Sequence, residues 1–232
     1  MRRVAGWTAY WVLFCVAILA LLGSLGVELT SFHMYSIPSA SMANTLQVGD
    51  RALTVKDTGV RRGDVVVYTP QDLGGGSLVK RVIGLPGDHV ACCDSLGRVT
   101  VNGKALTESY LYPGEPSMIH FSATLASGQV WVMGDHRDIS FDSRATGPVR
   151  MSAITGRVAV VIHDGHWTWL HTPAAFTSAG LAPADTRTIE LWPLVTAGAC
   201  VVLMLALGVF GIVGLVRRHR APAPVPYRSR GA

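Results

Sequence analysis

Cysteine is scarce in this chain, which excludes a fold held together by a disulfide framework. Four of the 232 residues are cysteines, and Cys15 and Cys200 lie inside apolar segments, where cysteine usually acts as a small hydrophobic residue. Cys92 and Cys93 are adjacent. An oxidising compartment would allow a vicinal bridge between them, but the sequence favours two free thiols on opposite faces of a strand.

Clustered metal ligands and a phosphate-binding loop are also missing. The histidines are scattered, and His163-x-x-His166 has no cysteine or carboxylate in register with it, so this pair predicts an exposed turn rather than a zinc site. The glycine run 74–76 lacks the Lys-Ser/Thr partner that a phosphate loop needs. The sequence therefore predicts neither a metal nor a cofactor.

Acidic residues are absent from both ends of the chain. Residues 1–27 and 191–232 carry seven arginines and no Asp or Glu, whereas residues 28–190 carry thirteen basic and fifteen acidic side chains. The net charge of +5 therefore comes from the flanks of apolar segments, a pattern typical of membrane orientation. A nucleic-acid partner is not expected.

Two uncharged runs predict transmembrane helices. Val4–Val27 would be roughly 36 Å long as a helix, enough for a hydrocarbon core about 30 Å thick. A cleaved signal peptide is the alternative, because Ser24-Leu25-Gly26 offers small residues. The length of this run and the second uncharged run favour permanent anchors at 7–28 and 191–216.

Arginines at the outer end of each anchor place residues 1–6 and the Pro-rich, disordered tail 217–232 in the cytoplasm. The region between the anchors then lies outside the membrane.

The region 29–170 predicts a mainly β domain, followed by a tether at 171–190. Asn102-Gly103 is a hairpin signal, the excursion 105–128 has no evident role, and Trp167 and Trp169 either rest on the membrane or pack in the core. Short β-branched runs are separated by Gly, Pro and Asp at 51–55, 64–68, 78–85, 89–93, 99–101, 129–133 and 154–162.

The first candidate for chemistry is a serine just beyond the first apolar run. Pro38 precedes Ser39 and Ser41, and a hydroxyl held there would lie close to a membrane surface. Lys80 lies in an apolar strand, where burial would lower its pKa until the neutral amine could take a proton from a serine. The alternatives are a Ser/Pro linker and a strand-edge lysine that points into solvent.

These segments resemble the signature boxes of bacterial type I signal peptidases. The resemblance is carried by Ser-Ile-Pro-Ser-Ala-Ser-Met at 36–42, by Val-Lys-Arg-Val-Ile-Gly-Leu-Pro-Gly-Asp at 79–88 and by Gly-Asp-His-Arg-Asp-Ile-Ser-Phe-Asp-Ser-Arg at 134–144. Gly49–Arg51 and Arg62–Val66 resemble the intervening boxes. The resemblance implies a mainly β domain of coiled sheets, outside the cytoplasm and flanked by two transmembrane helices.

The resemblance also implies a role for each matching position. Ser41 corresponds to the nucleophile and Lys80 to the general base. Ser39, with the Ser41 amide, corresponds to the oxyanion hole, and Ser140 corresponds to the hydroxyl that orients the lysine amine.

Further positions correspond to supporting and substrate-binding residues. Asp142 and Arg144 match an ion pair beneath the site, and Met42 matches an apolar residue that faces the bilayer. Four positions match the lining of shallow pockets for small side chains at substrate positions −1 and −3, namely Tyr35, Ile37, Leu46 and Val79.

The implied activity is the removal of signal peptides from secreted preproteins at the bacterial plasma membrane, with the bilayer and the secretion translocon as partners. Asn44 stands where the family often has proline, and His136 and Ile139 stand where it commonly has asparagine. Two alternatives remain: a self-cleaving Ser–Lys protease related to repressor-type domains, and a non-enzymatic anchored β domain. The second predicts Ser41 and Lys80 far apart and exposed.

Overall fold

The computed structural model divides the chain into two compact units, one made of residues 1–30 and 188–232 and one of residues 31–187. It describes residues 11–12, 14–20, 22–23, 32–56, 59–70, 76–113, 119–181, 198–199, 201–203, 205–206, 208–209 and 213.

The described residues of the terminal unit are α-helical, including residues 14–20 and 201–203. Within this described part of the chain, no helix has both the length and the apolar character needed to cross a bilayer. Most of the predicted anchors 7–28 and 191–216, the N-terminal residues 1–6 and the tail 217–232 lie outside the described residues.

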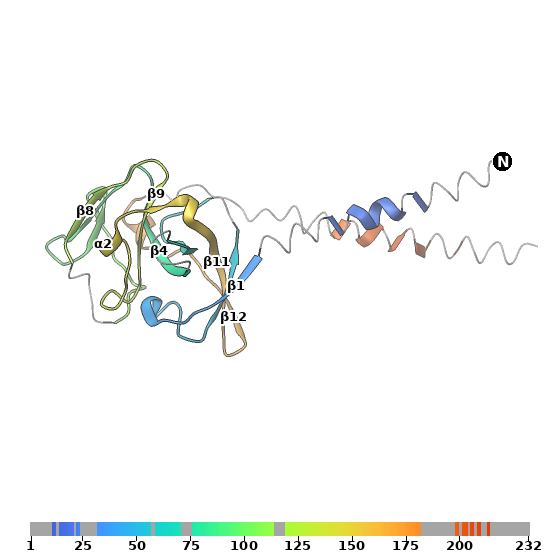
Figure 1. Ribbon diagram of the computed structural model, residues 1–232, viewed down its shortest axis with the longest axis horizontal. Coiled ribbons are helices and arrows are strands. Elements are labelled where there is room, and N and C mark those ends of the chain that lie inside the picture. Colours follow the sequence, from blue (N-terminus) through green and yellow to red (C-terminus); the bar gives the residue numbers. More distant parts are fainter. Residues whose placement is uncertain are drawn as a thin grey trace, which may run out of the picture. The chain divides into compact units, whose positions relative to one another are not determined.

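The second unit is built around an eight-stranded antiparallel sheet in the order β1-β2-β11-β3-β4-β9-β10, with β12 paired to β11 (Figure 1). Short 3-10 turns, η1 (Ala40–Met42) and η2 (Met151–Ala153), and two short helices, α2 (Ser143–Thr146) and α3 (Ala175–Ser178), connect or follow its strands. The strands are β1 (Phe32–Ser36), β2 (Arg51–Val55), β3 (Val65–Tyr68), β4 (Leu78–Gly84), β9 (Gln129–Met133), β10 (Val149–Arg150), β11 (Ile154–His163) and β12 (His166–Trp169).

A smaller four-stranded sheet has the order β7-β6-β5-β8, and Figure 1 shows β8 at the end of the unit away from β12. Its strands are β5 (His89–Cys92), β6 (Val99–Val101), β7 (Lys104–Ala105) and β8 (Phe121–Thr124). The predicted hairpin at Asn102-Gly103 is confirmed, because both residues have positive φ angles of 51° and 75° and join β6 to β7.

The mainly β class predicted from the sequence is confirmed, and each predicted β-branched run contains a strand. The strands without a prediction are β1, β7, β8, β10 and β12. β8 shows why: its burial alternates along Phe121–Thr124, but only two of its four residues are β-branched or aromatic. Part of the excursion 105–128 is thus a strand of the small sheet.

The expectation of two free thiols at Cys92 and Cys93 is wrong. The two sulfurs form a vicinal disulfide, and the peptide bond between the residues is cis. The prediction assumed that the strand continues through both residues, which would direct their side chains to opposite faces, but β5 ends at Cys92.

Of the two alternatives for Trp167 and Trp169, packing in the core is excluded, because the two residues are 66% and 61% exposed. The first part of the predicted tether is folded onto the unit, because Phe176 of α3 is buried in the core cluster of the small sheet. Residues 182–190 of the tether lie outside the described residues.

A separate hydrophobic cluster supports the segment that follows β1. Met42 and Leu46 are buried there against Ala52 of β2, Val65 of β3 and Val161 of β11. Burial of this apolar surface fixes the turn at Ala40–Met42 against the large sheet. The turn is therefore part of the packed domain and does not form a free Ser/Pro linker.

Candidate active site

Ser41 lies in the middle of the η1 turn, with a side chain that is largely withdrawn from solvent. Ser39 precedes the turn in an extended conformation, and the Ala43 amide donates to Ala40 O at 2.9 Å. Ser41 is 8% exposed, and its carbonyl oxygen accepts a hydrogen bond from the His136 amide at 3.1 Å. The backbone that carries this hydroxyl is therefore held in place by hydrogen bonds and by packing against the large sheet.

Lys80 reaches this hydroxyl from β4. It is 3% exposed, and its Nζ donates to Ser41 Oγ at 2.8 Å and to Val79 O at 2.9 Å. Burial disfavours the ammonium form and lowers the pKa of Lys80 to about 8, while the Asp142 and Asp135 carboxylates act in the opposite direction. A substantial fraction of this amine is thus neutral in mildly alkaline solution.

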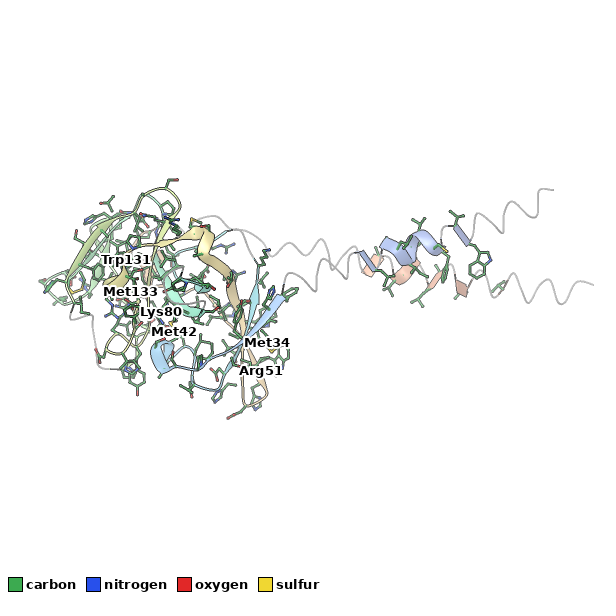
Figure 2. All side chains as sticks on the ribbon, in the orientation of Figure 1. Met34, Met42, Arg51, Lys80, Trp131 and Met133 are labelled. Carbon is green, nitrogen blue, oxygen red and sulfur yellow. A yellow bond between two sulfur atoms is a disulfide. The ribbon has the colours of Figure 1, made fainter. Side chains whose placement is uncertain are left out.

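Figure 2 labels Lys80 and Met42, the residue after Ser41, and both side chains are buried. Met34 and Arg51 mark the β1–β2 end of the large sheet in the same view, and Trp131 and Met133 mark β9. Lys80 belongs to β4, which pairs with β3 at this residue, and its side chain is buried.

The two further serines predicted at the site lie close to Ser41. Ser39 Oγ is 3.3 Å from Ser41 Oγ, and either hydroxyl can be the donor. The Ser140 oxygen is buried beside the Asp142 carboxylate, whose pKa it helps to lower, although it forms no well-aligned hydrogen bond with the described residues. Lys80 donates to Ser41 and Val79 instead, so the orienting role of Ser140 stays a prediction.

Asp142 and Arg144 form a buried bidentate ion pair next to the site. Arg144 Nε and Nη2 each donate to the Asp142 carboxylate at 2.9 Å, and the Gly134 amide donates to the same carboxylate at 2.9 Å. These hydrogen bonds outweigh burial and hold the pKa of Asp142 below its usual value. The pair joins the short helix α2 to the end of β9.

The residues predicted to line substrate pockets belong to one hydrophobic cluster. Ile37 and Leu46 are buried in it together with Met42, and Tyr35 and Val79 are partly buried against it. Val79 precedes the predicted base, and Met42 follows the predicted nucleophile. The expectation that Met42 faces a bilayer is wrong, because its side chain is buried in this cluster. The predicted pocket residues thus pack together next to the segment that carries Ser41, and their role in selecting substrates stays a prediction.

A buried ion pair behind Lys80 was not predicted from the sequence. Arg81 Nε donates to Asp135 Oδ1 at 2.8 Å, and its Nη1 donates to Gly63 O at 2.7 Å. The guanidinium also lies 4.2 Å from the centre of the Tyr110 ring. The available signal was an arginine inside an apolar strand directly after the lysine, because such a residue needs a buried partner.

The predicted exposed turn at His163-x-x-His166 is confirmed: Asp164 and Gly165 join β11 to β12 with φ angles of 47° and 81°. His163 Nδ1 lies 2.6 Å from Asp50 Oδ1, which raises the pKa of this histidine. Over the described ranges, no group of three His, Cys, Asp or Glu side chains could hold a metal ion.

The chemistry available here is that of a hydroxyl nucleophile beside a buried amine base. Ser41 and Lys80 are in hydrogen-bond contact and buried, which is the reverse of what the non-enzymatic alternative predicts.

Comparison with known proteins identifies the family. The model of the family "Signal peptidase, peptidase S26" matches residues 8–163. The chain is 35% identical over 150 residues to a protein named probable signal peptidase I-2 of Synechocystis sp., covering 61% of this chain and 67% of that protein. It is 30% identical over 167 residues to signal peptidase I V of Bacillus subtilis, covering 65% of this chain and 96% of that protein.

A solved structure of a signal peptidase I from Enterococcus faecalis V583 matches with 28% identity and a TM-score of 0.38, covering 43% of this chain and 97% of that chain. The family model spans more than half of the sequence, in agreement with the resemblance of the five boxes. The chain therefore belongs to the type I signal peptidases of the peptidase S26 family.

Proposed function

We propose that this protein is a membrane-bound serine endopeptidase that removes N-terminal signal peptides from secreted preproteins. Cleavage follows small residues at positions −1 and −3, with Ser41 as nucleophile and Lys80 as general base. Membership of the signal peptidase family and the names of the relatives support the substrate class. The bacterial plasma membrane is its location, with the β unit outside the cytoplasm and both termini inside.

The contact between Lys80 Nζ and Ser41 Oγ carries this proposal. A lysine in water is almost fully protonated at neutral pH and cannot accept a proton. Burial lowers the pKa of Lys80 to about 8, so the amine can be a base while it remains within 2.8 Å of the hydroxyl.

The reaction begins when the neutral Lys80 amine takes the Ser41 proton as Oγ attacks the carbonyl carbon of residue −1. The carbonyl oxygen becomes an oxyanion, to which the Ser41 amide and the Ser39 hydroxyl donate. The C–N bond then breaks, and the Lys80 ammonium gives its proton to the leaving amine. The mature protein departs, and the signal peptide stays attached to Ser41 as an ester.

Water completes the cycle. Lys80 takes a proton from the water molecule as its oxygen attacks the ester carbon. The C–O bond to Ser41 breaks, Ser41 Oγ regains a proton from Lys80, and the signal peptide leaves with a free carboxylate. The sequence of steps needs no metal and no cofactor, because every proton passes through one amine.

Substrate binding by strand addition is supported by the pairing of β4. Within the described residues, Leu78–Lys80 pair with β3 on one side, while the pairing of β4 with β9 begins only at Arg81. An extended signal peptide can therefore add between this free edge and Tyr35–Ser39, where main-chain hydrogen bonds give affinity. The pocket residues Tyr35, Ile37, Leu46 and Val79 then select small side chains.

The test is cleavage of a preprotein by the full-length chain in detergent or lipid. Ser41→Ala and Lys80→Ala are expected to lose at least a thousandfold in kcat, because the residues act as a unit. The matched controls are Ser95→Ala and Lys56→Ala, which alter exposed side chains of the same types. Cleavage by either site variant at the wild-type rate would refute the assignment.

A further inference from the structure

The segment Glu108–Tyr112, within the excursion of unassigned role, touches the nucleophile loop on two sides. One contact reaches the turn after Ser41, and the other reaches the residues that follow β9. The first contact involves Asn44, and the second includes His136.

Asn44 makes the first contact. Its side-chain amide donates to Tyr110 O at 3.2 Å and to Leu111 O at 3.1 Å. The backbone of Asn44 has a φ of 80°, a conformation that asparagine tolerates but that proline, with φ near −65°, cannot adopt. The amide bonds and the turn conformation therefore depend on this residue type.

Tyr112 makes the second contact. Its backbone amide donates to Asp135 O at 3.0 Å, and its ring stacks on the His136 ring with 4.2 Å between centroids. His136 in turn donates its backbone amide to Ser41 O at 3.1 Å. The Tyr112 ring therefore contacts His136, and the backbone of His136 is hydrogen-bonded to Ser41.

Hydrogen bonds also hold the segment Glu108–Tyr112 in place. The buried Arg137 guanidinium donates to both carboxylate oxygens of Glu108, and its Nε donates to Gly134 O at 3.0 Å. The Tyr110 hydroxyl donates to the same carboxylate at 2.6 Å. Glu108 thus ties the segment to the main chain immediately after β9.

We propose that Asn44 and Tyr112 are positioning residues, which hold the Ser41 turn through segment 108–112 and the His136 backbone. This inference rests on the proposed function, because it concerns the geometry of the same hydroxyl. The segment closes a circuit from Ser41 to His136, Tyr112, Leu111, Asn44 and back to the Ser41 turn. Without it, the hydroxyl would spend less time aligned with Lys80 and the substrate carbonyl.

Asn44→Gly is the first test, because glycine accepts the φ of 80° and removes only the side-chain hydrogen bonds. The full-length protein in detergent should lose about tenfold in kcat against a preprotein, with KM changed less than twofold. Asn44→Asp keeps the shape but cannot donate to the two carbonyls, and it should lose at least as much.

Tyr112 is tested by a pair of variants. Tyr112→Phe keeps the ring stack and should retain wild-type kcat, whereas Tyr112→Ala removes the stack and should lose several-fold. Asn102→Gly is the matched control, because Asn102 also has a positive φ but lies in the hairpin of the small sheet. This control loses the side-chain hydrogen bonds of Asn102 with His89 and Asp88, so it should lower Tm and leave kcat unchanged.

The pH profile separates positioning from a change in the base. The rate plateau should fall in Asn44→Gly, while the acid limb set by Lys80 stays where it is in wild type. Unchanged kcat in Asn44→Gly, or an equal loss in Asn102→Gly, would overturn the inference. Inactive wild-type protein would instead overturn the proposed function, so the two failures are distinguishable.

Discussion

The surroundings of Lys80 determine the pKa of its side chain. The side chain has the same chemistry as exposed Lys56, yet burial in β4 lowers its pKa to about 8. The Asp142 and Asp135 carboxylates favour the ammonium form and limit this shift, while the positive charge of Arg144 disfavours the ammonium form and adds to the shift. The reactivity of the proposed base is thus a balance between desolvation and two nearby anions.

The pH dependence of cleavage follows from this balance. Lys80 must be neutral to accept a proton, so kcat/KM should be low below pH 8, rise with a midpoint near pH 8 and level off above it. A pH–rate profile on a preprotein checks this, with Lys56→Met as a control whose midpoint should not move. A rate that is flat between pH 6 and 9 would contradict it.

Asp142→Asn should move that midpoint to lower pH. The change removes a carboxylate that raises the pKa of Lys80 and leaves the positive charge of Arg144, which lowers it, without its partner. Both effects have the same sign. A midpoint shifted to higher pH would show that another group controls the limb.

At the scale of elements, the residues that follow β9 lie directly against the η1 turn that carries Ser41. Gly134 follows β9 directly, and a Cβ built on it would overlap the Ser140 side chain and lie 2.5 Å from Ser41 O. The Asp142 carboxylate accepts a hydrogen bond from the Gly134 amide, so the backbone cannot easily move away. Only glycine fits between the nucleophile turn and Ser140.

Gly134→Ala should therefore reduce kcat by at least a hundredfold and cost about 1–3 kcal/mol in the free energy of unfolding. Gly103→Ala is a matched control, because a Cβ there meets nothing within 4 Å and only the positive φ is strained. The control should lose about 1 kcal/mol of stability and keep its activity. Kinetics and thermal unfolding measure both, and an active Gly134→Ala enzyme would contradict the contact.

At the scale of the whole molecule, the charges beside the two apolar runs determine the proposed orientation of the chain in the membrane. Residues 1–27 and 191–232 carry arginine without Asp or Glu, and residues 28–190 carry all fifteen acidic residues. Trp167 and Trp169 of β12 are exposed, which is compatible with contact between this unit and a membrane surface. The proposed orientation brings the Ser41 hydroxyl to the face from which preproteins emerge.

Cysteine labelling tests this orientation. Ser127→Cys, at an exposed turn before β9, should react with a membrane-impermeant maleimide in intact cells. Ser229→Cys, in the predicted cytoplasmic tail, should react only after the membrane is opened. Wild-type protein gives the background, and labelling in the reverse order would refute the topology.

The sequence alone determined the fold class, and its resemblance to a known family named Ser41 and Lys80 as candidates for the chemistry. Alternating β-branched runs and the Asn102-Gly103 turn predict strands, because pleat and turn geometry are local properties. The strands of the small sheet near the excursion were missed in part, because β8 gains its stability from pairing with β5 rather than from its own composition. The vicinal disulfide was missed because the strand ends between its two cysteines.

Tertiary structure decided how these residues act on one another. No spacing in the chain says that Lys80 is buried within 2.8 Å of Ser41, because that distance depends on how β4 packs beside η1. The Arg81–Asp135 pair and the contacts of Asn44 with Tyr110 and Leu111 likewise join segments far apart in sequence. The propensity to form a strand or a turn depends on neighbouring residues and can be predicted from the sequence. The desolvation of a side chain and its hydrogen-bond partners are decided only when distant segments pack together.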